Sequence, residues 1–263
     1  MPDTLIVAIN AANTRLNGRV ETLQPIGGQI VGNTNAFSQQ ICNDAWRKMQ
    51  NRLADLRYSG LQTETVLLAV PPAGNADPMN QAAISATGYF DGVNNAITPT
   101  LPAGLIQPYE LNERPSGTTN LFTEMDRLLW ALPRVPKANW NRQWLWRNNV
   151  LYLPGALVAT DISLLYAQLL ADFTDGTVPW FQQPIPIINC IDSLADYICR
   201  EIAIARGDQP AAIAFQQSAE DNARLILNQD SAGGKSIVKN AEYQKMADKF
   251  TPKVGPDTEP VNR

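Results

Sequence analysis

The chain has 263 residues, enough for one large domain or two small ones, and only 17% of them are charged. Its formal net charge is −4 and it has no extended run of Lys or Arg, which argues against direct binding to nucleic-acid phosphates. It holds no histidine, which excludes Ser-His-Asp and Cys-His mechanisms and removes the commonest transition-metal ligand.

The first two predicted elements are helices, at residues 3–17 and 36–59. Both segments repeat apolar residues at spacings of three and four, which predicts one buried stripe on each helix. The stripe of the first helix contains Leu5, Ile9, Ala12 and Leu16. The stripe of the second helix contains Phe37, Ile41, Ala45, Met49, Leu53 and Leu56. Thr34 or Asn35 can cap the second helix, and Gly60 ends it.

Strand periodicity follows the second helix. Residues 63–70, 84–93 and 105–113 are short apolar segments among Pro, Gly, Asn and Thr, so we expect each of them to be a strand. Residues 121–132, which read LFTEMDRLLWAL, predict a short helix that Pro133 stops. The middle of the chain is therefore expected to be rich in β-structure.

Residues 156–173 fit two different periods. The alternating apolar set is Ile162, Leu164, Tyr166 and Leu170. The set with helical spacing is Leu165, Leu169 and Phe173. The alternating set predicts a long strand and the other set a helix, and we favour the strand.

The stretch 139–155 reads NWNRQWLWRNNVLYLPG and holds three of the six tryptophans. Asn tolerates positive φ, so Asn148 and Asn149 predict a two-residue turn between two strands. One face of this hairpin then carries Trp144, Trp146, Leu151 and Leu153. We favour burial of that face in the core, and a subunit interface and a sugar-stacking platform remain as alternatives. The candidate interface residues here are Trp140, Trp144, Trp146 and Tyr152.

Two further helices are predicted, at residues 187–206 and 209–228, with a tight connection at Gly207 and Asp208. Their short connection predicts an antiparallel helical hairpin. The stripe of the first helix contains Ile188, Ile191, Leu194, Ala195, Ile198, Ile202 and Ala205. The stripe of the second helix contains Ala212, Phe215, Ala219, Ala223 and Ile226.

Residues 231–263 are predicted to be an extended tail. Gly233 and Gly234 separate it from the last helix, and three prolines prevent a long helix or a central strand. One weak helix is expected at 239–250, and it could dock in a groove of a neighbouring subunit; a disordered end is the alternative. The candidate interface residues of the tail are Tyr243, Met246 and Phe250.

These elements predict an α+β protein, in which N- and C-terminal helices form a helical bundle and the middle is a β-rich insertion. The bundle is expected to comprise residues 1–60 and 187–230. The β-rich insertion then covers residues 61–186, and the tail covers residues 231–263.

Three motif-like stretches lack parts of the sites they resemble. The stretch SAGGKS at 231–236 lacks the first glycine of a phosphate-binding loop. The stretch 172–176 lacks most oxygen ligands of a calcium loop. Glu124 and Asp126 point to different faces of the helix predicted there, so they form no acid pair. We therefore expect no catalytic residue, no cofactor and no metal, and a protein that is not an enzyme.

The three cysteines are Cys42, Cys190 and Cys199, an odd number without a CxxC pair. They predict buried, reduced thiols rather than a disulfide framework or a zinc site, as suits assembly in a reducing cytoplasm. The chain has no basic segment followed by an apolar one at its start and no apolar run near 18 residues. Neither an ordinary secretion signal nor a membrane span is expected.

The order of elements resembles that of the head–tail adaptor proteins of tailed bacteriophages, the connector or tail-tubular-A-like proteins. The stretches that carry the resemblance are RLNG at 15–18, QQICNDAWRKMQNRLADLRYSG at 39–60, WRNNVLYLPG at 146–155, WFQQPIPI at 180–187 and IINCIDSLADYICREIAIARGD at 187–208. The resemblance covers most of residues 1–230 and is one of layout and local texture. The long β-rich middle departs from the smallest, almost wholly helical adaptors.

The resemblance implies a virion structural protein that forms a dodecameric ring at the neck between capsid and tail. Such a ring binds the portal protein on one side and tail or nozzle proteins on the other. DNA passes through its central channel without sequence-specific binding, and no membrane is involved. Assembly takes place in the host cytoplasm. The alternative is a carbohydrate-binding protein, or another tail structural protein, that uses the aromatic hairpin at 140–153.

Overall fold

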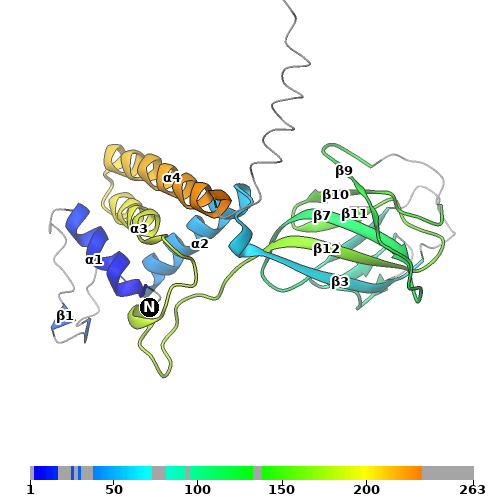
Figure 1. The fold of residues 1–263 in the computed structure, drawn as a ribbon, viewed down its shortest axis with the longest axis horizontal. Coiled ribbons are helices and arrows are strands. Elements are labelled where there is room, and N and C mark those ends of the chain that lie inside the picture. Colours follow the sequence, from blue (N-terminus) through cyan, green and yellow to red (C-terminus); the bar gives the residue numbers. More distant parts are fainter. Residues whose placement is uncertain are drawn as a thin grey trace, which may run out of the picture.

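The computed structural model describes residues 3–16, 25–26, 29–30, 38–72, 81–92, 95–132 and 138–232. The fold is α+β, as predicted. Four α-helices lie together at one end of the molecule, and two larger sheets form the other end (Figure 1). We call these ends the helical region and the β region.

Helices α1 (Leu5–Arg15) and α2 (Gln39–Asp55) correspond to the first two predicted helices. Ser38 caps α2, because its hydroxyl oxygen accepts a hydrogen bond of 3.3 Å from the N–H of Ile41. The helix therefore begins later than predicted, and the predicted cap residues and Phe37 lie outside the described residues. The stripe residues that are buried are Leu5, Ile9, Ala12, Ala45, Met49 and Leu53.

Helices α3 (Ile191–Ala205) and α4 (Gln209–Ala232) pack along each other and are joined by a turn at Gly207, whose φ is 76°. Asn189 has a φ of 58°, which interrupts the helical path, so α3 begins at Ile191 instead of 187. As a consequence Ile188, predicted on the buried stripe, is exposed. Helix α4 continues through Ala232, beyond its predicted end at residue 228.

One hydrophobic cluster joins all four helices. Trp46 of α2 is its largest fully buried side chain, and its ring lies 5.3 Å from that of Phe173, measured between centroids. Phe173 belongs to the loop between the last strand and α3, and the same loop contributes Phe181, Ile185 and Ile187. This loop, which the sequence placed within the β-rich insertion, therefore packs on the helices.

The first of the two larger sheets has four strands, in the order β3 (Gln62–Val70), β12 (Thr160–Gln168), β7 (Leu105–Pro115) and β8 (Thr123–Glu124). A short 3-10 turn, η1 (Ser59–Leu61), leads from α2 into β3. β12 is antiparallel to a neighbour on each side, so the segment with two possible periods is a strand, as favoured. Its central position explains why nearly all of its residues are buried.

The second larger sheet has six strands, in the order β6, β5, β4, β11, β10 and β9. Their bounds are Asn95–Ala96, Gly88–Phe90, Ala82–Ser85, Val150–Leu153, Gln143–Arg147 and Asp126–Leu128. The single strand predicted at 84–93 is thus two strands with a turn between them. A separate pair consists of β1 (Pro25–Ile26) and β2 (Gln29–Ile30), and η2 (Trp180–Gln182) is a short 3-10 turn.

The helix predicted at 121–132 is wrong, because this segment forms β8 and β9. Its backbone groups bond to distant segments. The N–H of Met125 donates to the carbonyl of Leu111 on β7 at 2.9 Å, and the N–H of Asp126 donates to the carbonyl of Arg142, just before β10, at 2.8 Å. Met125 is buried between the sheets. Long-range pairing therefore overrides the helix propensity of the segment.

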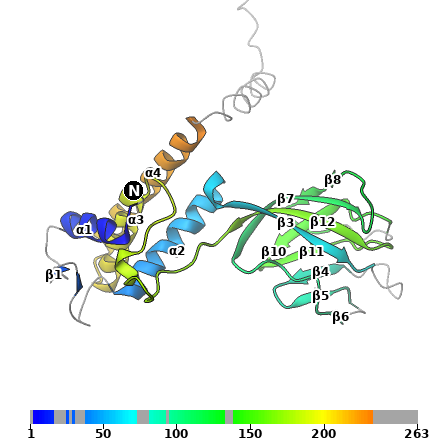
Figure 2. The same ribbon diagram turned by 60° about the horizontal axis from the view of Figure 1, so that its bottom comes forward.

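The two larger sheets lie face to face and share a second hydrophobic cluster (Figure 2). The four-stranded sheet contributes Leu67, Val70, Leu111, Ile162, Leu164 and Tyr166. The six-stranded sheet contributes Ala82, Ile84, Tyr89, Trp144, Leu151 and Leu153. The buried positions that alternate along β4 and β11 are those that face the other sheet.

Helix α2 connects the two regions. The carbonyl of Ala54, near its end, accepts hydrogen bonds from the Tyr109 hydroxyl at 2.6 Å and from Gln107 Nε2 at 2.8 Å, both on β7. The chain that leaves β12 is also held by α2: Gln50 Oε1 accepts from the N–H of Leu170 at 2.6 Å, and Trp46 Nε1 donates to the carbonyl of Ala171 at 3.1 Å. Both chain crossings between the regions are therefore tied to one helix.

Candidate interaction surfaces

The aromatic hairpin forms as predicted. Asn148 and Asn149 have φ values of 53° and 59°, and β10 pairs with β11 so that Trp146 faces Leu151 and Leu145 faces Tyr152. Positive φ at both turn residues gives the turn the twist that the flanking strands require.

Trp144 lies in the core of the β region. Its side chain is 1% exposed, and its Nε1 donates a hydrogen bond of 3.2 Å to the carbonyl of Met125. The guanidinium of Arg127 lies 5.2 Å from the centre of the ring. Trp146 and Tyr152 are partly buried. Of the hairpin residues proposed for an interface, Trp144 is thus enclosed within its own subunit.

Trp140 lines an open cleft at one end of the β region. The cleft has a volume of about 380 Å³ and is lined by Glu113, Thr123, Glu124, Asp126, Trp140 and Arg142. Glu124 and Asp126 are both exposed and share this cleft. The prediction that they point to different faces was wrong, because it assumed a helix where two short strands lie.

Buried Glu113 fixes the chain beside this cleft. It is 2% exposed; its Oε2 accepts from the N–H of Asn141 at 2.8 Å, and its Oε1 accepts from the N–H of Arg142 at 2.6 Å. Arg142 has a φ of 59°, which is unfavourable for a residue with a side chain. Asn141 is itself buried and bonds to Thr160 and to the N–H of Gly155. The cleft wall is therefore preorganised by a satisfied polar network.

Several large apolar side chains of the β region are exposed, and sequence reasoning missed them. Trp130 is 88% exposed at the end of β9, and Leu129 and Leu121 are exposed in the same segment. The helix predicted there would have buried part of this set, so no sign in the sequence indicated that these side chains are exposed. In the helical region, Ile213 and Leu225 of α4 are also exposed. Contiguous exposed apolar patches mark interaction surfaces, whereas single exposed apolar residues are ordinary.

The tail residues proposed for an interface, Tyr243, Met246 and Phe250, lie outside the described residues.

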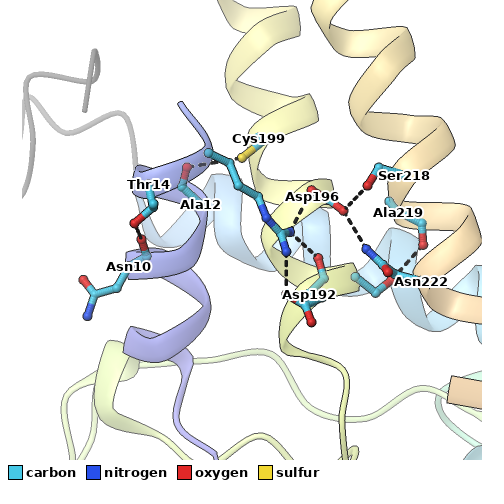
Figure 3. A network of polar contacts seen from close by, with 11 residues as sticks. Asn10, Ala12, Thr14, Asp192, Asp196, Cys199, Ser218, Ala219 and Asn222 are labelled. Carbon is cyan, nitrogen blue, oxygen red and sulfur yellow. Dashed lines mark hydrogen bonds and ion pairs between the residues drawn. The ribbon is translucent and has the colours of Figure 1, made fainter. Parts of the chain in front are cut away.

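A polar cluster holds three helices together at the opposite end of the molecule (Figure 3). Arg15 of α1 donates to Asp196 Oδ1 of α3 at 2.7 Å and also pairs with Asp192. Asp196 Oδ2 accepts from Ser218 at 2.7 Å and from Asn222 at 2.9 Å, both on α4. We call these five residues the Asp196 cluster. Asp196 is 2% exposed, and its carboxylate has both a cation and neutral donors as partners.

The three cysteines are free and buried, as predicted. Burial raises the pKa of each thiol to about 12, so the thiolate is not populated near neutral pH. The described residues include no group of three or more Cys, Asp or Glu side chains arranged to hold a metal ion. Within the same part of the chain, no helix is long and apolar enough to cross a membrane.

No protein-family model matches the sequence, and no curated protein matches it.

Proposed function

We propose that this protein is a virion structural subunit, a head-to-tail adaptor that assembles into a ring between portal and tail. In this proposal the N- and C-terminal helices form the bundle of each subunit and the β-rich middle is an insertion. The ring would contain twelve copies, lie at the neck of the particle and leave a channel for DNA. It would assemble in the host cytoplasm and have no enzymatic role.

The observation that carries this proposal is the exposure of large apolar side chains on both regions. Trp130 and Leu129 lie on the β region, and Ile213 and Leu225 lie on α4 of the helical region. An adaptor needs two separate contact surfaces, one for each side of the neck. The resemblance in element order points to the same class of protein. The proposal is supported further by the hydrogen bonds of Tyr109, Gln107 and Gln50, because they join the β region to α2.

The test is negative-stain electron microscopy of the purified protein, alone and mixed with its portal protein. We expect rings, or ring formation on the portal. Replacement of Trp130 by Glu should weaken binding to one partner while the melting temperature stays unchanged. Trp130→Phe is the matched control, since it keeps an aromatic side chain at the same position. A protein that stays monomeric and binds neither portal nor tail components would overturn the proposal.

A second function, carbohydrate binding, is favoured by the Trp140 cleft alone. Its wall offers one partly buried aromatic ring and both donors and acceptors of hydrogen bonds. Glycan-array binding that Trp140→Ala abolishes without loss of stability would support this function. Loss of glycan binding in a Trp144 variant would carry no such meaning, because Trp144 is core.

A further inference from the structure

β3 is a long strand at the edge of its sheet. It pairs with β12 on one side, and no described strand pairs with its other side. It has nine residues, whereas the other edge strands of the two larger sheets, β6, β8 and β9, have two or three. An edge of this length presents a row of main-chain N–H and C=O groups that an extended strand can fill.

The outer side of β7 differs from this edge. β8 pairs with part of it, and the N–H of Met125 bonds to the carbonyl of Leu111. Toward its start, Gln107 and Tyr109 bond to α2. The bonds of Gln107 and Tyr109 come from their side chains, so they place α2 beside the start of β7, whereas β8 pairs with its main chain. Among the described residues, β3 is thus the long strand that has no strand on its outer side.

β3 also lacks the residues that usually protect an edge. It contains no Lys and no Pro, and its one charged residue is Glu64. The Glu64 carboxylate accepts a hydrogen bond of 2.6 Å from Ser163 on β12, so it is held against its own sheet. Val66 and Leu68 are 39% and 65% exposed on this strand. The edge thus lacks a lysine or proline guard, and its two exposed large apolar side chains, Val66 and Leu68, lie at its middle and toward its end.

The irregular part of β3 is confined to its end. Pairing with β12 runs without a break from Gln62 to Leu67, and the register shift comes only beyond Leu67. There Ala69 has a φ of 50°, and its N–H donates to Asp161 Oδ1 at 3.0 Å instead of to a strand. The register shift marks a bulge at this end of the strand, and beyond it only Val70 pairs with β12, at Thr160. Residues 62–67 therefore remain regular and available.

We propose that β3 pairs with β3 of a second copy of this chain, antiparallel and about a two-fold axis perpendicular to the sheet. Pairing along the whole of this edge requires an extended strand of similar length. Among the described edge strands, β3 alone has this length. Self-pairing also matches charge, since a register centred anywhere except Glu64 places each carboxylate opposite a neutral residue. Two four-stranded sheets then become one sheet of eight.

This pair goes beyond the proposed function. A two-fold contact uses the same surface on both subunits and closes on itself, whereas a ring requires head-to-tail contacts. The β3 pair is therefore a form of the free protein, in which the open edge is covered until assembly. The two proposals are tested by different measurements, because a β3 dimer can exist whether or not rings form on a portal.

The first experiment is light scattering coupled to size exclusion on the full chain without partners. We expect twice the subunit mass, falling to the subunit mass for Val66→Lys, because a lysine on an edge strand opposes edge-to-edge pairing. Ile188→Lys is the matched control, because Ile188 is exposed before α3, far along the chain from the edge, and should leave the dimer intact. Circular dichroism checks that both variants fold. A monomeric wild type, or a dimer that Val66→Lys leaves unchanged, would overturn the proposal.

The second experiment locates the axis. In an antiparallel self-pair of this symmetry one residue faces its own copy, at a Cα separation of about 4.5–5.5 Å that suits a disulfide. Single cysteines at Thr63, Glu64, Thr65 and Val66 should give a cross-linked dimer most efficiently at one position. The native thiols do not interfere, since all three are buried. A dimer that none of these cysteines cross-links would assign the contact to another surface and refute the β3 pair.

Discussion

Asp196 in the helical region and Glu113 in the β region are equally buried, but different donors satisfy them. Asp196 is bound by side chains of α1 and α4, including the cation of Arg15. Glu113 accepts its two shortest hydrogen bonds from the main-chain N–H groups of Asn141 and Arg142, with a longer one of 3.3 Å from Asn141 Nδ2. Main-chain N–H groups within a helix already donate to carbonyls of the same helix, whereas N–H groups in the loop before β10 are free to bind a carboxylate.

This difference shows how each region is specified. A carboxylate between helices must recruit side chains, so the Asp196 cluster joins segments 181 residues apart in sequence. A carboxylate beside a loop can fix the backbone directly, so Glu113 sets the conformation of Arg142. Stability in the β region comes mainly from apolar burial such as that of Trp144.

The largest effect is expected for Trp144→Ala, which tests the claim that apolar burial dominates the β region. Removing a fully buried Trp should lower the free energy of unfolding by about 4 kcal/mol. Urea unfolding followed by circular dichroism measures it. Trp130→Ala is the control, since Trp130 is exposed and its loss should change stability little. Equal free energies of unfolding for Trp144→Ala and Trp130→Ala would contradict the claim that apolar burial dominates the stability of the β region.

Asp196→Ala comes next and tests the side-chain cross-link. It leaves Arg15, Ser218 and Asn222 without their shared acceptor, and we expect a loss of about 3 kcal/mol. Asp221→Ala, at an exposed i,i+3 pair with Arg224, should cost almost nothing. The double variant Arg15→Ala with Asp196→Ala should cost less than the sum of the single changes, and strict additivity would show that the pair is not coupled.

Glu113→Gln tests the main-chain contact and should cost about 2 kcal/mol, because an amide NH2 then faces a backbone N–H. Glu110→Gln on the same strand is the control, since Glu110 is exposed. Thermal melts of both variants measure the difference. An unperturbed Glu113→Gln would mean that the Arg142 conformation does not depend on the carboxylate.

The smallest expected effect is the dependence of stability on pH that Asp161 causes in the β region. Burial raises the pKa of Asp161, but hydrogen bonds from the Ala69 N–H, Ser116 and Arg114 outweigh it, so the pKa lies below its ordinary value. A lowered pKa stabilises the fold above the unfolded value of about 3.9 and ceases to do so as the pH falls through the folded value. Asp161→Asn should therefore be less stable at pH 7, by about 1 kcal/mol, and the difference should shrink in acid. A difference that grows as the pH falls would contradict this assignment.

Local patterns were enough to predict much of the fold. The Asn148–Asn149 turn and the apolar alternation beside it are contained in nine residues, so the hairpin and its register follow from sequence. The stripes of α2 and α4 are equally local. The segment 121–132 was different, because its strands exist only through bonds to β7 and β10.

The candidate sites were harder to predict for the same reason. Glu113 meets Asn141 and Arg142 across 28 and 29 residues, and nothing in its neighbourhood in sequence marks it as buried. Trp130 was hidden by the wrong helix. Trp144 was expected in the core and is found there, since alternation along a strand reports which face is covered.

The attachment of both chain crossings to α2 has a mechanical consequence. Tyr109 and Gln107 hold the end of this helix at Ala54, while Gln50 and Trp46 hold the returning chain along it. A force or torque on the sheets should therefore move α2 as a rigid unit, because these bonds leave no hinge between the helix and the sheets. Helix α2 therefore links the two regions rigidly, and a force on the sheets is transmitted through it to the hydrophobic cluster around Trp46.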